Sequence, residues 1–377
     1  MRVKIVSIRD LNDAEIGQWR DWAYQDGQLV SPYLLPDFAF AVDQVRADVR
    51  VAVLEKDGET VGYYAYHGPR HLGLRPVGAP MSDYQGIAAK PGITICPNEF
   101  LTQLGAGFMV YENWWNGAGC TIENTRERDG SVVVDLSDGP DTYFAERKAA
   151  HKSQFKKMER RLRNAERDFG PVRLVVGDPN GQLFEALSHW KSEQYTSTGK
   201  LDVFDVDWAR QLLVNLNASN DPGFQGLTFA LYFGEDLAAV EFGLRAGDLY
   251  HSWFPAYDER FAKVSPGLLL LHEIFKAAPE LGLARVDLGK GGAHYKTYYA
   301  SYEVPLDSGR IIAPSFAALG LRTWDMAEHC AKFLPGKLSE LPVRARRRWS
   351  QISAFEPEMG PRLKTFAKSF RAHSSAA

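Results

Sequence analysis

The chain has 377 residues with a hydrophobic fraction of 45% and a charged fraction of 24%, values typical of a folded globular protein rather than a disordered one. No apolar run approaches the roughly 18 residues that a membrane span needs. The N-terminus, MRVKIVSIRD, predicts a strand and lacks the apolar core and cleavage site of a signal peptide. Cys96, Cys120 and Cys330 lie far apart and match neither a disulfide framework nor a metal-ligand spacing. We therefore expect a cytoplasmic protein of two or three domains without a metal site.

The first half of the chain alternates strand-like and helix-like segments. Turn residues between two β-rich runs are a good hairpin signal, and Lys56-Asp57-Gly58 is such a turn. The predicted elements, in chain order, are a strand (3–8), a helix around AEIGQWRDWAYQ, a hairpin (49–55 and 60–67), a strand in MSDYQGI (81–87), a short helix from Pro97 and a strand (108–114).

Near residue 172 the same order begins again. The turn Gly234-Glu235-Asp236 repeats the hairpin signal of the first half. The predicted elements are a strand (172–176), a helix in QLFEALSHWKSEQY, a hairpin (227–233 and 237–245), a strand (249–256), a helix from Pro266 and a strand (284–289).

The order β-α-β-β-β-α-β thus occurs twice, at offsets of about 170–178 residues. This repetition predicts an α/β (α+β) protein with two tandem domains of one kind, each a mixed, mostly antiparallel sheet flanked by helices. We expect the N-terminal domain to cover residues 1–143 and the C-terminal domain residues 171–312.

Residues 144–170 are predicted to form a basic connecting helix. Phe155, Met158, Leu162, Ala165 and Phe169 recur at steps of three and four residues, so one stripe is apolar. The opposite faces carry Lys152, Lys156, Lys157, Arg160, Arg161, Arg163 and Arg167. This helix either docks by its stripe with a solvated outer face, or forms a basic wall that receives phosphate, an anionic glycan or RNA.

The repeat stops near residue 313, and residues 313–377 are predicted to be a helical, basic extension. FAALGLRTWDMAEHCAKFL has an amphipathic helical pattern, and Arg344, Arg346, Arg347 and Arg348 follow it. This extension packs on the two domains, or it contacts a partner or an anionic membrane surface.

Ser265-Pro266-Gly267 precedes four leucines and predicts a helix N-terminus, with Ser265 as its N-cap and Pro266 in the first turn. Gly267 lowers helix propensity but allows another group to approach the backbone. Either Gly267 packs closely against a neighbour, or the free N–H groups of this helix bind an anion such as a phosphate.

These segments together resemble the GNAT acyl-CoA transferase fold in its duplicated, FemABX-like form, and most of all the cellulose-biosynthesis (CelD-like) acetyltransferase group. The stretches that carry the resemblance are SPYLLPDF (31–38), PMSDYQGI (80–87), the basic helix, SPGLLLLHEI (265–274) and DLGKGGAHYKTYYA (287–300). It covers roughly residues 1–310. The usual glycine-rich loop is reduced here to Ser265-Pro266-Gly267, and FemABX relatives take aminoacyl groups from tRNA instead of acetyl-CoA.

The resemblance implies that the second half holds the acyl donor. The pyrophosphate of acetyl-CoA would bind at Ser265, Pro266, Gly267, Leu268 and Leu269, with Gly291 and Lys296 from the glycine-rich loop as further contacts. Lys296, in a Tyr-Lys pair that also occurs in the resembled group, either binds phosphate or the oxyanion, or is a surface lysine. Tyr295 is a candidate proton donor to the leaving thiolate.

Acyl transfer also needs a base for the acceptor proton. His251 is the first candidate because its ordinary pKa suits work near neutrality, although a strand histidine is often a hydrogen-bonded core residue. Glu241 and Asp287 are the next candidates. Asp83, Tyr84 and Gln85, with His67 and His71 nearby in sequence, are expected either to line an acceptor pocket or to satisfy their own turn.

The resemblance implies transfer of an acyl group to a sugar or amino sugar in polysaccharide or cell-envelope biosynthesis, with acetyl-CoA expected as the donor. One alternative is a FemABX-like aminoacyl transferase that uses aminoacyl-tRNA. The other is a non-catalytic subunit of a polysaccharide-synthesis complex, docked through the C-terminal helices.

Overall fold

The computed structural model describes residues 1–24, 30–68, 70, 73–116, 125–198, 200–313 and 316–331, together with separate residues beyond 331. His71, Cys120, Arg344, Arg346 and Arg347, which the sequence analysis singled out, lie outside the described residues.

The first half of the chain builds a five-stranded antiparallel sheet in the order β1-β2-β3-β4, with β5 also paired to β3. The predicted hairpin is confirmed, and its turn residues Asp57 and Gly58 both have positive φ, which suits the twist of the strands. The elements are β1 (Arg2–Val6), α1 (Asp13–Ala23), α2 (Pro36–Val45), β2 (Arg50–Lys56), β3 (Glu59–His67), β4 (Arg75–Pro76), β5 (Ala88–Ala89) and α3 (Pro97–Leu104).

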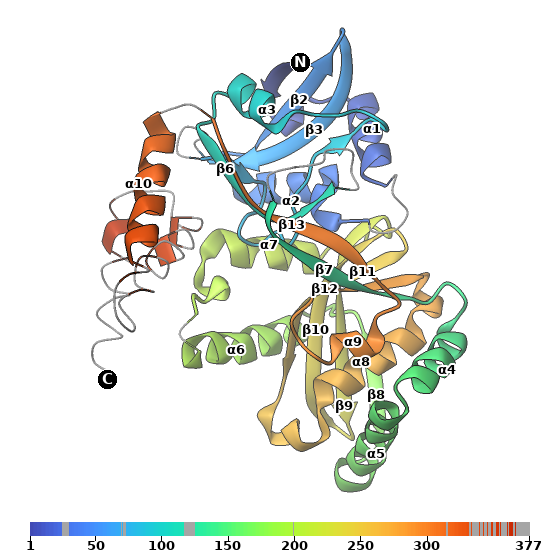
Figure 1. Ribbon diagram of the computed structural model, residues 1–377. Helices are drawn as coiled ribbons and strands as arrows, with labels where there is room; N and C mark the ends of the chain where they lie inside the picture. Colours follow the sequence, from blue (N-terminus) through green and yellow to red (C-terminus); the bar gives the residue numbers. More distant parts are fainter. Residues whose placement is uncertain are drawn as a thin grey trace.

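A second sheet has eight strands in the order β6-β13-β7-β12-β11-β10-β9-β8 (Figure 1). Its strands are β6 (Phe108–Trp115), β7 (Thr125–Asp135), β8 (Val172–Val176), β9 (Phe224–Phe233), β10 (Asp236–Ala246), β11 (Leu249–Tyr257), β12 (Arg285–Lys290) and β13 (Tyr302–Ile312). The remaining helices are α4 (Pro140–Ala150), α5 (Lys152–Phe169), α6 (Gln182–Ser197), α7 (Asp207–Asn217), α8 (Pro266–Ala277), α9 (Lys296–Tyr299) and α10 (Phe316–Ala331).

Strands from both halves of the chain share this second sheet. β7 belongs to the first half, yet it pairs antiparallel with β12 on one side and β13 on the other. Val132, Val133 and Val134 of β7 are all buried, as expected for a central strand covered on both faces. β7 therefore joins the two halves through backbone hydrogen bonds.

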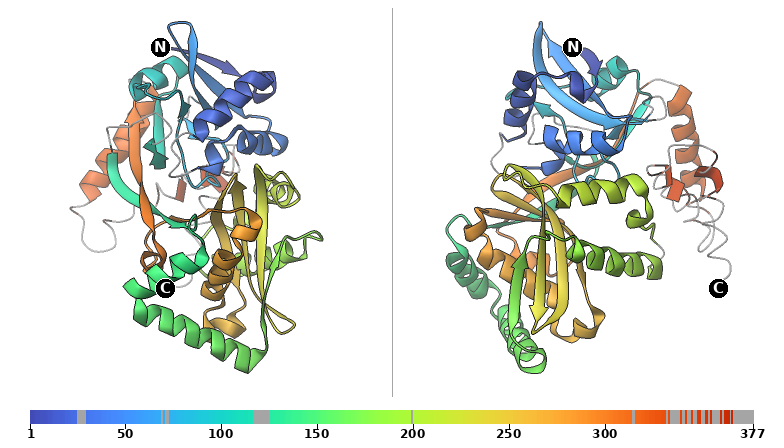
Figure 2. Two further views of the ribbon diagram at one scale, coloured as in Figure 1. Left: turned by 90° about the vertical axis from the view of Figure 1, so that its right-hand side faces the viewer. Right: turned by 180° about the vertical axis from the view of Figure 1, so that it is seen from behind.

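Helices cover both faces of the large sheet (Figure 2). α8 contacts β9 and β10 on one face, with α5 packed against α8, whereas α6 and α7 contact the other face. α7 also packs against α2 of the first half, and one apolar core runs continuously from Trp19 and Phe38 to Leu212 and Phe242. The two halves are consequently fixed to each other by side-chain packing as well as by strand pairing.

Two sequence predictions of local structure were wrong. Residues 81–87 form no strand, because the backbone of this segment pairs with the large sheet only at a single isolated bridge, between Gln85 and Trp114. The expected continuous helix over 144–170 is divided at His151 into α4 and α5. The break lets both helices bury aromatic side chains: Tyr143 hydrogen-bonds the Tyr299 carbonyl, while Phe155 packs on His272 of α8.

The sequence analysis also missed elements that the structure contains. α2 and α7 follow α1 and α6 in corresponding places, and β7 and β13 complete the large sheet. The run Val132-Val133-Val134 was the available signal for β7, because consecutive β-branched residues favour a buried strand.

Within the described residues, no helix combines the length and apolar character that a membrane crossing requires. The same residues contain no group of three or more His, Cys, Asp or Glu side chains that could hold a metal ion.

The close approach of β10 and β11 depends on Gly243, which lies at a register shift in their pairing. A Cβ atom at Gly243 would lie 2.1 Å from the backbone oxygen of His251, a clash that no side-chain rotation relieves. We predict that Gly243→Ala lowers the free energy of unfolding by about 2–3 kcal/mol or more, the range of overpacked cores. Gly267→Ala is the matched control, because its Cβ would meet only Tyr257 at 4.0 Å. Equal free energies of urea unfolding for the two variants would contradict a clash at Gly243.

Candidate active site

The candidate site lies where β11 and β12 separate. These two strands run parallel but pair only from Leu249–Arg285 to His251–Asp287, after which they diverge. His251 and Asp287 therefore sit side by side at the last point of pairing. Beyond them, the backbone groups of the two strands no longer pair with each other, and this separation is called the strand opening below.

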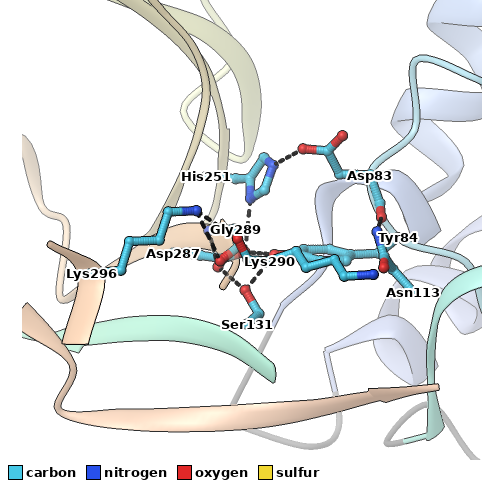
Figure 3. Close-up of polar contacts among 9 residues, drawn as sticks. All are labelled: Asp83, Tyr84, Asn113, Ser131, His251, Asp287, Gly289, Lys290 and Lys296. Atoms are coloured by element: carbon cyan, nitrogen blue, oxygen red, sulfur yellow. Dashed lines mark hydrogen bonds and ion pairs between the residues drawn. The ribbon is translucent and has the colours of Figure 1, made fainter. Parts of the chain in front are cut away.

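Asp287 is the centre of a fully buried hydrogen-bond network (Figure 3). Its Oδ2 accepts from the Tyr84 hydroxyl at 2.7 Å and lies 2.8 Å from Nδ1 of His251. Its Oδ1 accepts from Ser131 Oγ at 2.5 Å and from the Gly289 N–H at 2.9 Å. Burial alone would raise the pKa of Asp287, but the His251 charge and these hydrogen bonds lower it below its ordinary value. Asp287 is thus held as a carboxylate.

His251 is held between two carboxylates. Its Nδ1 faces Asp287 and its Nε2 lies 3.0 Å from Asp83 Oδ2, while its side chain is fully buried. Burial alone would lower the pKa of His251, but the charge and hydrogen bond of Asp287 and the contact with Asp83 raise it to about 9. At neutral pH His251 is therefore an imidazolium whose two N–H groups are both occupied.

Asp83 is the member of this network that reaches the surface. Its side chain is 43% exposed, whereas those of His251 and Asp287 are fully buried. Its loop is held in place by Asn113, whose side-chain amide donates to the Asp83 backbone carbonyl at 2.9 Å. Figure 3 shows Asp83 and Tyr84 reaching His251 and Asp287 from the side opposite Lys296. Oδ2 of Asp83 contacts His251, which leaves Oδ1 of Asp83 as the carboxylate oxygen that can contact a bound molecule.

Lys296 approaches the same network from α9. Its Nζ donates to the backbone oxygens of Lys290 at 2.7 Å and Gly289 at 3.4 Å. A Cβ at Gly289 would lie between Lys296 Nζ at 3.9 Å and His251 at 3.7 Å, which shows how close the two side chains are. Burial lowers the pKa of Lys296 from its ordinary value, while the charges of Asp287 and Asp83 oppose this. Lys296 is positioned to place a positive charge beside the strand opening.

Tyr295, the neighbour of Lys296, is also partly buried. Burial, with a smaller contribution from the Glu241 charge, raises the pKa of its hydroxyl to about 12. The hydroxyl therefore keeps its proton at neutral pH.

Glu241 lies on β10, outside the network of His251. It is buried, and its Oε1 has no hydrogen-bond partner among the described residues; the same is true of the Tyr250 hydroxyl. Burial raises the pKa of Glu241, because the charged form loses its hydration without gaining a full set of partners. The structure therefore groups His251, Asp287, Tyr84, Asp83 and Lys296 together, and leaves Glu241 apart from them.

The predicted anion site at the start of α8 has fewer free donors than expected. Ser265 is the N-cap residue, as predicted, but its backbone is left-handed (φ 55°) and its side chain makes no capping hydrogen bond. The N–H groups of Leu268 and Leu269 donate to the Ser265 carbonyl at 3.0 and 3.2 Å. Among the described residues, the Gly267 N–H has no such partner, and a Cβ at this glycine would meet only Tyr257, at 4.0 Å. Close packing does not explain Gly267.

Three other predicted residues lie away from the network. The Gly291 N–H donates to the Gly130 carbonyl at 2.9 Å, so it is already occupied. Gln85 is buried and, with Tyr33 and Tyr84, lines a small cavity with room for about one water molecule. His67 is buried near Arg46 and Asp48, and burial lowers its pKa to about 3, so it stays neutral.

Sequence reasoning missed Ser131 and Tyr33. Ser131 lies on β7, a strand that was not predicted, and a serine after a glycine carries no signal of its own. Tyr33 lies edge-on to His251, with ring centroids 5.3 Å apart, and to Trp253 at 5.5 Å. The stretch SPYLLPDF had been noted, but no residue within it had been assigned to the site.

Residues 152–297, which include α5, β11, α8, β12 and Lys296, match the model of the acetyltransferase (GNAT) domain family. The chain carries a GNAT domain. This confirms the resemblance for that segment and the expected acyltransferase class. The fold class, α/β with mixed sheets flanked by helices, is confirmed by the two sheets described above. No curated protein matches the chain.

Several solved structures resemble the whole chain at low identity. FemX is 10% identical, with 82% of this chain and 96% of FemX covered and a TM-score of 0.47. A tandem GNAT protein from the clavulanic acid biosynthesis pathway is 12% identical, covering 83% and 100% of the two chains, with a TM-score of 0.44. The C-terminal domain of a putative lysylphosphatidylglycerol synthetase from Agrobacterium fabrum is 12% identical, covering 82% and 96%, with a TM-score of 0.46.

The raised pKa of His251 in the GNAT domain predicts a pH-dependent stability. A group whose folded pKa is raised contributes stability that is fully present below its unfolded pKa and is lost as pH rises through its folded pKa. For His251 that window runs from about pH 6.5 to about 9. At about 1.4 kcal/mol per pKa unit, the loss amounts to about 3 kcal/mol.

We therefore expect the stability advantage of the wild type over His251→Gln to shrink by about 3 kcal/mol between pH 6 and pH 9.5, measured by urea unfolding. His189→Gln, at a histidine with a 70% exposed side chain, is the control and should follow the wild type at every pH. A pH-independent difference between wild type and His251→Gln would show that the pKa of His251 is not raised in the folded protein.

Proposed function

We propose that this GNAT-type acyltransferase moves an acetyl group from acetyl-CoA to a hydroxyl or amine of a sugar or amino sugar used in polysaccharide or cell-envelope biosynthesis. The observation that carries the proposal is the Asp83–His251–Asp287 network at the point where β11 and β12 separate. It places a partly exposed carboxylate and a nearby lysine beside an opening that can admit a thioester.

The donor is proposed to lie along β11. Its pyrophosphate would meet the start of α8, where Gly267 stands next to Tyr257, the last residue of β11. From Tyr257 to His251 the strand covers about 20 Å, at ~3.3 Å per residue. An extended pantetheine arm can span such a distance, so the thioester would reach the point where the strands separate.

The acceptor is proposed to enter beside Asp83. Tyr33 and the partly buried Trp253 give this side an aromatic wall next to a carboxylate. A sugar ring offers apolar C–H faces to such a wall and hydroxyl or amino groups to the carboxylate. This combination favours a small polar acceptor with a ring.

In the proposed reaction Asp83, rather than His251, accepts the proton. The acceptor oxygen or nitrogen forms a bond to the thioester carbonyl carbon while Asp83 takes its proton, and the C–S bond then breaks. His251 orients Asp83 and offsets its charge, and Asp287 in turn holds His251. Lys296 would stabilise the oxyanion, and the Tyr295 hydroxyl, protonated at neutral pH, would protonate the leaving thiolate.

A second candidate, an aminoacyl-tRNA-dependent transferase, is favoured by one observation. Lys152, Lys156, Arg160, Arg163 and Arg167 are exposed and follow one face of α5 at three- and four-residue steps. Such a row fits a phosphate backbone, and tRNA binding through it would weaken steeply with salt.

Binding of the donor can be tested by calorimetric titration with acetyl-CoA. We expect micromolar affinity for the wild type and for Gly267→Ala, and loss of binding for Gly267→Glu, because a carboxylate there repels the phosphates and fills their space. Folding of each variant is checked by circular dichroism. A folded wild type that binds no acetyl-CoA would rule out the acetyl-CoA reading, and salt-dependent binding of tRNA would then support the second candidate.

The role of Asp83 can be tested once a screen of sugars and amino sugars has found an acceptor. We predict that Asp83→Asn lowers kcat by roughly 10²–10⁴-fold, the contribution of a general base, with acetyl-CoA affinity unchanged. Glu241→Gln is the matched control, with kcat near that of the wild type. Because the pKa of Glu241 is raised, its charge costs stability as pH rises above about 4.5, so Glu241→Gln should also be more stable at pH 8. If Glu241→Gln were inactive and Asp83→Asn active, Glu241 rather than Asp83 would be the general base.

A further inference from the structure

The most exposed large apolar side chains of the described residues all lie in the C-terminal extension. Leu319 is 60% exposed, Met326 64%, Phe333 82% and Leu363 54%, whereas the highest value before residue 313 is the 45% of Tyr257. Exposed apolar groups that gather in one region mark an interaction surface more often than single ones do.

Leu319 and Met326 are spaced by seven residues and lie on one face of α10, and Phe333, two residues after the helix ends, continues the same spacing. Cys330, four residues after Met326, is exposed in the same stripe. On the opposite side of the helix, Ala331 is buried and the Trp324 ring N–H donates to the carbonyl of Pro342, in the same extension, at 3.3 Å. α10 thus presents an apolar stripe to solvent, and Figure 1 shows it at the margin of the molecule, apart from α4 and α5.

The extension is also the positively charged part of the sequence. Residues 313–377 contain 11 Lys and Arg against 5 Asp and Glu, a net charge of +6. Because the whole chain has a net charge of −3, residues 1–312 carry −9. An apolar stripe within a cationic segment is the combination that holds a helix in the interface of an anionic membrane.

We propose that the outward stripe of α10 docks on an anionic lipid surface. A second copy of the chain fits this stripe less well, since it would bring another segment of charge +6 against the first. Docking would place the enzyme beside the membrane without a spanning helix, with cations contacting the headgroups and the three apolar side chains entering the interface. This inference does not depend on the acyl donor or acceptor.

The test is sedimentation of the full chain with vesicles of phosphatidylcholine alone or mixed with phosphatidylglycerol, at low and high salt. We expect binding only to the mixed vesicles, weaker at high salt, and at least tenfold weaker for the triple variant Leu319→Ser, Met326→Ser and Phe333→Ser. The double variant Lys156→Glu and Arg160→Glu on the basic face of α5 is the control for general charge, and should bind within about twofold of the wild type.

Three results would overturn the proposal: no binding of the wild type to either vesicle, equal binding of the triple variant, or equal loss in the α5 control. Size-exclusion chromatography is run in parallel. A wild-type dimer that the triple variant converts to a monomer would assign the stripe to self-association instead. All variants change exposed side chains, and their folding is checked by the unfolding midpoint.

Discussion

The buried carboxylate of Asp287 is the interaction on which the rest of the structure depends. A carboxylate without hydration is costly unless its oxygens are well supplied with donors, and here three of its four donors come from distant parts of the chain. His251 comes from β11, Ser131 from β7, and Tyr84 from the loop after β4. The charge can exist inside the protein only when both halves are in place. Conversely, the halves are held in one orientation because the carboxylate requires all of these donors.

The same requirement explains the state of His251. Two carboxylates, one buried and one at the surface, keep the imidazole charged although it has no contact with water. A pair of this kind transmits the position of Asp287 to Asp83, so in the proposed reaction the group that meets the acceptor is aligned by a group that never does. In this proposal the buried His251 and Asp287 fix the geometry of the site, and the acceptor side contributes only the partly exposed carboxylate of Asp83.

Much of this architecture could be predicted from the sequence, because the repeated element order and the hairpin turns are local signals. His251 was found because the ordinary pKa of histidine suits a base near neutrality, and Asp287 and Lys296 because they stand beside the glycine-rich loop. Ser131 could not be found, since nothing near it in sequence indicates that β7 lies next to β12. Likewise, the contact between Asp83 and His251 spans 168 residues, and no periodicity encodes it. The role of Asp83 became visible only from its exposure beside a buried partner.

The position of β7 has a consequence for how the chain is made. β7 ends at Asp135, whereas its partner β12 begins about 150 residues later, at Arg285, and β13 follows at Tyr302. At ~5–20 residues per second, a ribosome needs on the order of ten seconds or more to add the missing partners. During that interval the valine-rich β7 has neither neighbour, and it is an open, apolar edge in the nascent protein. We expect the first half to need chaperone protection until the second half emerges, and not to mature as an autonomous unit.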